Sequence, residues 1–226
     1  ERGITIFSKQ AILKVEGELE ITLLDTPGHV DFSAEMERTL QVLDYGILVI
    51  SATDGVQGHT RTLWRLLEQY QVPVFLFINK MDQPGTDRKR GMEELKSRLD
   101  DGCVDLLREG AQEEIALCGE AAMEAFLRTG IVPQEEKAKL VAERKLFPCF
   151  FGSALRMRGV DTLLDALLEL VPAPVYGDAF GARVYKITHD SQGTRLTWMK
   201  MTGGSLRARE LIRGDGWEEK VNQIRL

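Results

Sequence analysis

Three short and almost wholly apolar runs constrain the fold of this chain more than any other feature. Tyr45–Ala52 reads Y-G-I-L-V-I-S-A, Pro73–Asn79 reads P-V-F-L-F-I-N, and Phe147–Phe151 reads F-P-C-F-F. These runs lack the alternation of a half-exposed strand and are typical of parallel strands buried on both faces. They predict the core of a parallel sheet.

Segments with helical periodicity lie between and after these runs. They are residues 30–44, Thr60–Tyr70, Met92–Leu99, Val160–Leu170 and a Glu-rich helical insertion over about 100–145. Before them, Lys9–Val15 and Glu18–Asp25 form a predicted hairpin around Glu16-Gly17. The alternation of strand and helix predicts an α/β fold with a doubly wound, mostly parallel sheet and helices on both faces.

A second domain is expected after the Pro-x-Pro sequence that begins at Pro172. Beyond it, the extended runs Ala182–Thr188, Arg195–Met201 and Glu210–Arg213 are separated by turn sequences, which indicates the start of an antiparallel β-barrel. We therefore predict a first domain over residues 1–172 and the beginning of a barrel domain over 176–226.

Composition narrows the class of protein. The 226 residues carry a net charge of −6, although residues 183–226 hold nine Lys and Arg against five Asp and Glu. That basic tail suits a position near phosphates, and a solvated strand face would look the same. The three cysteines form no metal-ligand pattern, and no apolar run approaches membrane-spanning length. We expect a cytoplasmic protein with reduced thiols and with neither membrane nor DNA as a partner.

The sequence Asn79-Lys80-Met81-Asp82 follows the second apolar run. The Asp82 carboxylate can accept two hydrogen bonds from the N1–H and N2–H₂ donors of guanine, and adenine has no such pair on that edge. Asn79 is placed to tie neighbouring loops together, and the methylene stem of Lys80 to cover one face of the base. Taken alone, the same four residues also fit an Asx turn with a surface lysine.

Two further loops end strands in the same way. Ser153-Ala154-Leu155 follows the third apolar run, where small residues let backbone N–H groups approach a base carbonyl; alone, this sequence also fits a helix cap. Asp25 ends the predicted hairpin and can hold Mg²⁺ through a water, while Gly28 lets an N–H reach a terminal phosphate. His29 is then placed to orient an attacking water. Because ligands bind at the carboxyl ends of such strands, we expect these loops to meet in one crevice.

In this order, Asp25–His29, Asn79–Asp82 and Ser153–Ala154 resemble the third, fourth and fifth nucleotide-binding motifs of GTP-binding proteins. Histidine after D-T-P-G looks like the translational GTPases. Arg2–Ile6 resembles the end of their first switch, whose threonine, here Thr5, binds Mg²⁺ and the γ-phosphate. The resemblance implies a ribosome-dependent GTPase that uses GTP, GDP and Mg²⁺, with His29 catalytic and with Asn79, Lys80, Asp82, Ser153, Ala154 and Leu155 around the guanine.

Within that superfamily, Ile50–Gln57 and Phe77–Gln83 look most like the tetracycline-resistance ribosomal protection proteins, which are relatives of elongation factor G. Ribosomal RNA and ribosomal proteins are then the implied partners. The insertion over 100–145 resembles an extra subdomain of this family, which suits docking of a ribosomal stalk protein, and a solvated helical face would look the same. Alternatives are a translocase like elongation factor G, a release-factor recycling GTPase, or a non-enzymatic ribosome-binding module.

One expected motif is missing from the sequence. The phosphate loop G-x-x-x-x-G-K-[ST] should precede the first switch, yet the dipeptide Gly-Lys occurs nowhere in the chain. We therefore expect a fragment of the GTPase without its first strand, phosphate loop and first helix, inactive by itself and a weak binder of guanine nucleotide. Apolar sheet surface exposed by that loss predicts self-association.

Overall fold

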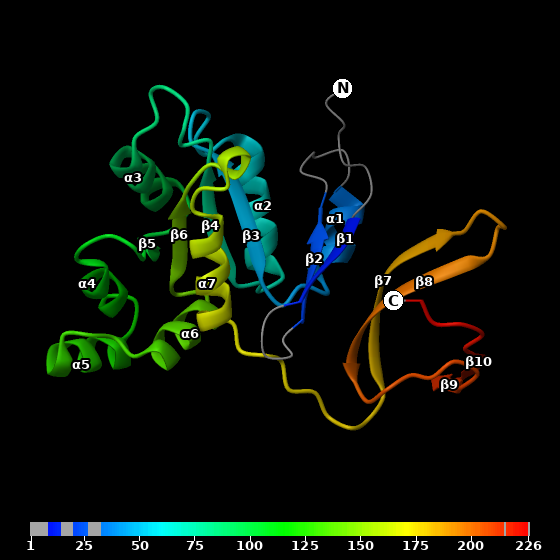
Figure 1. Cartoon of the computed structure of the whole chain (residues 1–226). Coiled ribbons are helices and arrows are strands. Elements are labelled where there is room, and N and C mark those ends of the chain that lie inside the picture. Colours follow the sequence, from blue (N-terminus) through cyan, green and yellow to red (C-terminus); the bar gives the residue numbers. More distant parts are fainter. Residues whose placement is uncertain (1–8, 15–19, 27–32, 215, 226) are drawn as a thin grey trace. The chain divides into compact units, whose positions relative to one another are not determined.

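The computed structural model describes residues 9–14, 20–26, 33–214 and 216–225 of the chain (Figure 1). Contacts divide the chain into two compact units, residues 1–173 and residues 174–226, and each is described here by itself. The domain limits expected from the sequence, 1–172 and 176–226, stay predictions about which parts fold independently.

The first unit is built on a four-stranded parallel sheet, as the apolar runs predicted. The strand order is β3-β4-β6-β5, and every neighbouring pair is parallel. The strands are β3 (Gly46–Ser51), β4 (Val74–Asn79), β6 (Phe147–Phe151) and β5 (Cys103–Asp105). Crossovers between parallel strands place helices on the faces of the sheet, and the predicted fold class is confirmed here.

Helices cover both faces of this sheet. One face packs against α1 (Ser33–Leu40), α2 (Gly58–Gln69) and α3 (Arg88–Arg98), and the other against α4 (Ala111–Ala116), α5 (Glu120–Thr129), α6 (Gln134–Ala142) and α7 (Val160–Leu170). Successive residues of β4 alternate between the two cores, because Leu76 belongs to the first and Phe75 and Phe77 to the second.

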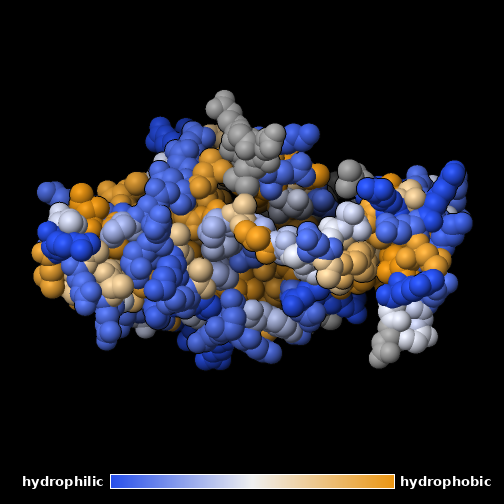
Figure 2. Space-filling view, turned by 90° about the horizontal axis from the view of Figure 1, so that it is seen from below, coloured by the Kyte–Doolittle hydropathy of each residue, from blue (hydrophilic) through white to orange (hydrophobic). Residues whose placement is uncertain are grey.

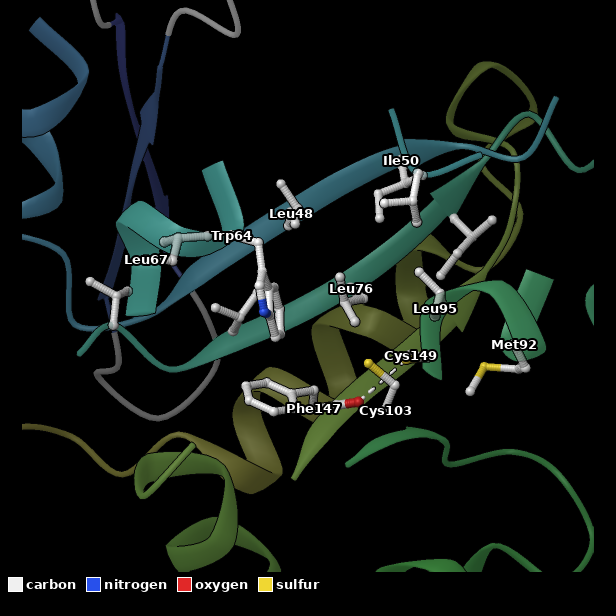
Figure 3. Close-up of a cluster of buried hydrophobic side chains, with 14 of the residues drawn as sticks. Leu48, Ile50, Trp64, Leu67, Leu76, Met92, Leu95, Cys103, Phe147 and Cys149 are labelled. Carbon is white, nitrogen blue, oxygen red and sulfur yellow. Dashed lines mark hydrogen bonds between the residues drawn. The ribbon is translucent and has the colours of Figure 1, made fainter. Parts of the chain in front are cut away.

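Figure 3 shows the core between the sheet and helices α2 and α3. The Trp64 ring meets the Phe147 ring edge-on, with 4.7 Å between their centroids. Close by, the Cys149 thiol donates to the Phe147 carbonyl at 3.3 Å. All three cysteines of the chain are free thiols. Aromatic and aliphatic side chains therefore fix the sheet on this side without any covalent link.

The expectation that Tyr45–Ala52 is buried on both faces was wrong for one face. Leu48 and Ile50 are buried, whereas Ile47 is 37% exposed and Val49 is 57% exposed. β3 is the end strand of the four-stranded sheet, and the second core covers β4 and β6 instead. The apolar composition therefore predicted the strand correctly but not its burial, because its second face is exposed to solvent in the described part of the chain.

The Glu-rich stretch over 100–145 was predicted as helical throughout, and this needs correction. It holds the short strand β5 before the three helices α4, α5 and α6. Three residues are too few to show a sequence periodicity that would predict a strand. The strand is defined instead by its parallel pairing with β6. Cys103 and Val104 of this strand are completely or almost completely buried.

The predicted hairpin is present as β1 (Lys9–Lys14) and β2 (Glu20–Asp25), which pair antiparallel in a sheet of their own. The second unit is wholly antiparallel, as expected of the start of a barrel. Its strands are β7 (Gly181–His189), β8 (Arg195–Gly203), β9 (Leu211–Gly214) and β10 (Trp217–Lys220), paired β7 with β8 and β9 with β10. Among the described residues, no helix has the length and apolar character needed to span a membrane.

Candidate functional site

The loops that follow β4 and β6 are joined to one another at the carboxyl end of the sheet. The side-chain oxygen of Asn79 accepts from the backbone N–H of Lys80 at 2.8 Å and from that of Ala154 at 2.9 Å. The Met81 N–H also donates to the Gly152 carbonyl at 3.0 Å. β4 and β6 are hydrogen-bonded neighbours, so residues about 75 positions apart in sequence meet here. Asn79 thus connects the two loops, as the sequence suggested.

Lys80 has an unusual backbone conformation. Its φ is +65°, in the left-handed region that a residue with a side chain seldom occupies. Two contacts hold it there: its own N–H binds Asn79, and its carbonyl accepts from the Gln83 N–H at 3.0 Å. The Thr86 hydroxyl closes the same turn by donating to the Met81 and Gln83 carbonyls. Such local strain is typical of functional loops.

The loop after β6 depends on a very close backbone approach. Ser153 and Arg158 exchange two backbone hydrogen bonds of 3.0 Å each, so the chain doubles back on itself. A Cβ atom at Gly152 would lie 2.2 Å from the Arg158 carbonyl oxygen, which no side chain tolerates. Glycine is therefore required at position 152 for the chain to reverse here. The reversed loop exposes Ala154, Leu155 and Arg156 to solvent.

Asp82 lies at the centre of this arrangement. Its Oδ2 accepts from the Arg156 Nε at 3.4 Å, and the side chain of Asp82 is 19% exposed. The Ser153 hydroxyl, and then the Arg156 guanidinium, hold the pKa of the Asp82 carboxyl below its ordinary value, so the group is ionised at neutral pH. Ser153 itself is buried, and its Oγ meets no partner at full hydrogen-bond geometry among the described residues. The site thus offers an ionised acceptor beside a buried hydroxyl.

Two side chains could cover a planar ligand bound at Asp82. Leu155 is 90% exposed, although it is a large apolar residue on a short turn. Lys80 extends from the other loop, and its Nζ lies 4.0 Å from Asp54 Oδ2 in the loop after β3. Burial of Leu155 against a base would remove apolar surface from water.

The other residues predicted for the site lie on a different sheet or outside the described residues. Asp25 is exposed at the end of β2, which belongs to a different sheet from β4 and β6. Its contribution to the same crevice stays a prediction. Thr5, Gly28 and His29 lie outside the described residues. In the described ranges, no group of three or more His, Cys, Asp or Glu residues is placed to hold a metal ion.

The sequence did not indicate two residues of this site. Arg156 contacts Asp82 from 74 positions away, and Asp54 faces Lys80 from another strand end. Both are charged residues in loops that follow strands of the parallel sheet. That position is the only signal in the sequence that could have drawn attention to them.

Comparison with known proteins places these loops in a family context. Residues 1–173 match the family described as the Elongation factor Tu GTP binding domain. The fold also matches a crystal structure of a protein from Thermus thermophilus with a TM-score of 0.82 and 24% sequence identity. That match covers 97% of this chain and 40% of the Thermus protein, so the chain spans less than half of that protein's length.

Proposed function

The chain belongs to the Elongation factor Tu GTP-binding domain family, and from this premise we propose that its own site binds the guanine of GTP and GDP between the loops after β4 and β6. The observation that carries the proposal is the joining of the two loops: the Ala154 N–H donates to Asn79 at 2.9 Å, and the Asp82 carboxylate contacts Arg156 of the second loop. Family membership is the basis for proposing a guanine nucleotide as the ligand. The contact between the two loops is the basis for proposing where its base binds.

Base selection follows from the donors and acceptors of this site. The Asp82 carboxylate takes the N1–H and N2–H₂ donors of guanine, and a base without that pair leaves the carboxylate unsatisfied. The Ser153 hydroxyl favours the ionised form of this carboxyl, because it lowers the pKa of Asp82. Leu155 and the methylene stem of Lys80 cover the base, which accounts for the exposure of so large an apolar side chain.

For the whole protein we propose GTP hydrolysis that depends on the ribosome. In this proposal His29 orients the water that attacks the γ-phosphorus, and the leaving group is GDP. Thr5 and Asp25 are the proposed ligands of Mg²⁺, which would supply charge neutralisation on the phosphates. Arg195, Lys200, Arg207 and Arg209 of the basic second unit are proposed contacts to ribosomal RNA.

The finer proposal is that the protein confers tetracycline resistance by ribosomal protection. Expression of the complete gene in a sensitive bacterium should raise tetracycline tolerance, and a His29→Ala variant expressed at the same level should lose that effect. Unchanged tolerance would favour a translocase like elongation factor G or a recycling GTPase.

Calorimetric titration with GDP and Mg²⁺ tests the guanine site directly. An Asp82→Asn variant should bind GDP at least about tenfold more weakly, because an amide NH₂ would face the N1–H and N2–H₂ donors. The same variant should bind xanthosine diphosphate better than the wild type does, since the C2 carbonyl of xanthine accepts from that NH₂.

An Asp87→Asn variant is the matched control, because it removes the same charge five residues along while its side-chain oxygen still accepts from the Arg90 N–H. Equal losses of GDP affinity in the two variants would contradict the proposed role of Asp82.

A further inference from the structure

The guanidinium of Arg156 occupies an acceptor that the proposed guanine needs. Its Nε donates to Asp82 Oδ2 at 3.4 Å, and the Arg156 side chain is 60% exposed. A guanine bound through N1–H and N2–H₂ uses both oxygens of a carboxylate. The base must therefore share Oδ2 with Arg156 or displace it, and the motif residues alone do not reveal this.

The geometry makes Arg156 easy to displace. The contact is long for a charge-assisted hydrogen bond, which is ordinarily about 2.7–2.9 Å, and it uses one guanidinium nitrogen instead of a bidentate pair. The Arg156 backbone, by contrast, is fixed, since its N–H donates to the Ser153 carbonyl at 3.1 Å. Its side chain can swing into water while the loop keeps its shape.

We propose that Arg156 is a replaceable counter-ion for Asp82, which holds the carboxylate in place before guanine binds and is released when it does. This inference rests on the proposed guanine site and adds a residue that sets its affinity. Arg156 lowers the affinity of the site for guanine, because each binding event must break the contact between Arg156 and Asp82. The Ser153 hydroxyl stays beside Asp82 in both states.

The size of the effect follows from the exposure of the pair. Exposed ion pairs contribute little, so removal of the arginine side chain should tighten guanine binding by at most about fivefold. Such competition also weakens as salt screens the exposed pair. The difference in affinity between the wild type and a variant without Arg156 should therefore shrink at high ionic strength.

The test compares GDP binding, in the presence of Mg²⁺, to the wild type, Arg156→Met and Arg158→Met. Arg158 lies two residues along the same exposed loop, so its substitution removes the same charge and controls for weaker general attraction of an anionic nucleotide. Arg156→Met should bind GDP more tightly than Arg158→Met, by about twofold to fivefold in low salt. Damage to the fold could only weaken binding, so a gain is specific.

Equal or weaker binding by Arg156→Met, relative to Arg158→Met, would overturn the inference while leaving the guanine site intact. No GDP binding by any of the three proteins would overturn the site and the inference together. As a second readout, the pKa of the Asp82 carboxyl, followed by carbon NMR, should rise in Arg156→Met without nucleotide and stay unchanged in Arg158→Met. An unchanged value in Arg156→Met would also contradict the inference.

Discussion

Asp105 shows how a single buried charge is held in this protein. The residue is 2% exposed on the short strand β5, and burial of a carboxylate is costly without partners. Arg88 of α3 binds both of its oxygens, with Nε to Oδ2 at 2.5 Å and Nη2 to Oδ1 at 2.6 Å. The Leu107 N–H adds a third contact at 3.2 Å, and the guanidinium also lies over the Phe151 ring. This pair attaches the insertion to α3, the helix that follows the loop after β4.

Removal of Arg88 should therefore destabilise the fold. An Arg88→Ala variant leaves a buried carboxylate without its bidentate partner, and we expect a loss of about 3 kcal/mol in the free energy of unfolding. Urea denaturation followed by circular dichroism measures this loss. The matched control is Arg90→Ala on the same helix, which should cost far less because the contact described for Arg90 is made by its backbone N–H, to Asp87, and not by its guanidinium. A loss for Arg88→Ala no larger than for Arg90→Ala would contradict the argument.

At the scale of single elements, β3 differs most from the other strands. It is the end strand of the parallel sheet, and the described residues provide no second strand beside it. Its sequence G-I-L-V-I-S is uncharged and rich in β-branched residues, and Ile47 and Val49 are exposed. An edge of this kind is a template for pairing with another strand. A second copy of the same strand has the same uncharged, apolar character, so we propose that the chain self-associates through β3.

A charge on this strand should reduce that association. The Val49→Lys variant should elute as a smaller species than the wild type in size-exclusion chromatography with light scattering, because an exposed lysine opposes edge pairing. Leu117→Lys is the control, since Leu117 is 75% exposed on the insertion, away from the sheet edge. The proposal fails if the wild type is monomeric at high concentration, or if both lysine variants change the elution equally.

The insertion and the second unit also leave apolar side chains in contact with solvent. Leu107, Leu127 and Ile131 are each more than half exposed in the first unit, and Trp217 is so in the second. Figure 2 shows such hydrophobic side chains interspersed with hydrophilic ones on the face that it views. Singly scattered apolar residues are common on protein surfaces, so they carry no functional argument by themselves.

At the scale of the whole molecule, the chain consists of two units joined by an exposed connection. Residues 172–180 form no helix or strand, and Val175 is 97% exposed. A segment with few contacts and two prolines, Pro172 and Pro174, is typical of a boundary between domains. Each unit therefore has its own set of internal contacts.

This division predicts the course of limited proteolysis. Chymotrypsin should cut after the exposed Tyr176 or Phe180 before it cuts within the insertion, because a protease needs an accessible and extended segment. Mass spectrometry of the early digest identifies the site. Earlier cleavage at Leu117 or Phe126, inside the packed insertion, would show that the helices open more readily than the connection.

Much of the parallel sheet was predictable, because the relevant signals are local. A run such as P-V-F-L-F-I-N reports its own burial, and the polar residues at its end mark where the strand stops. Val160–Leu170 was predicted with the bounds that α7 has in the structure, since its apolar residues recur at helical spacing. The Asn79–Asp82 and Ser153–Leu155 loops were recognisable for the same reason, as short patterns of chemically specific residues.

Sequence alone indicated three of the four strands of the parallel sheet, the residues proposed for the guanine site, and the family that the chain resembles. Only the tertiary structure decided that Arg156 contacts Asp82, that Gly152 faces the Arg158 backbone and that one side of β3 is open. The reason is that periodicity and motifs describe a residue's immediate neighbours in the chain. Contacts between residues far apart in sequence depend on the order and the ends of the strands in the sheet.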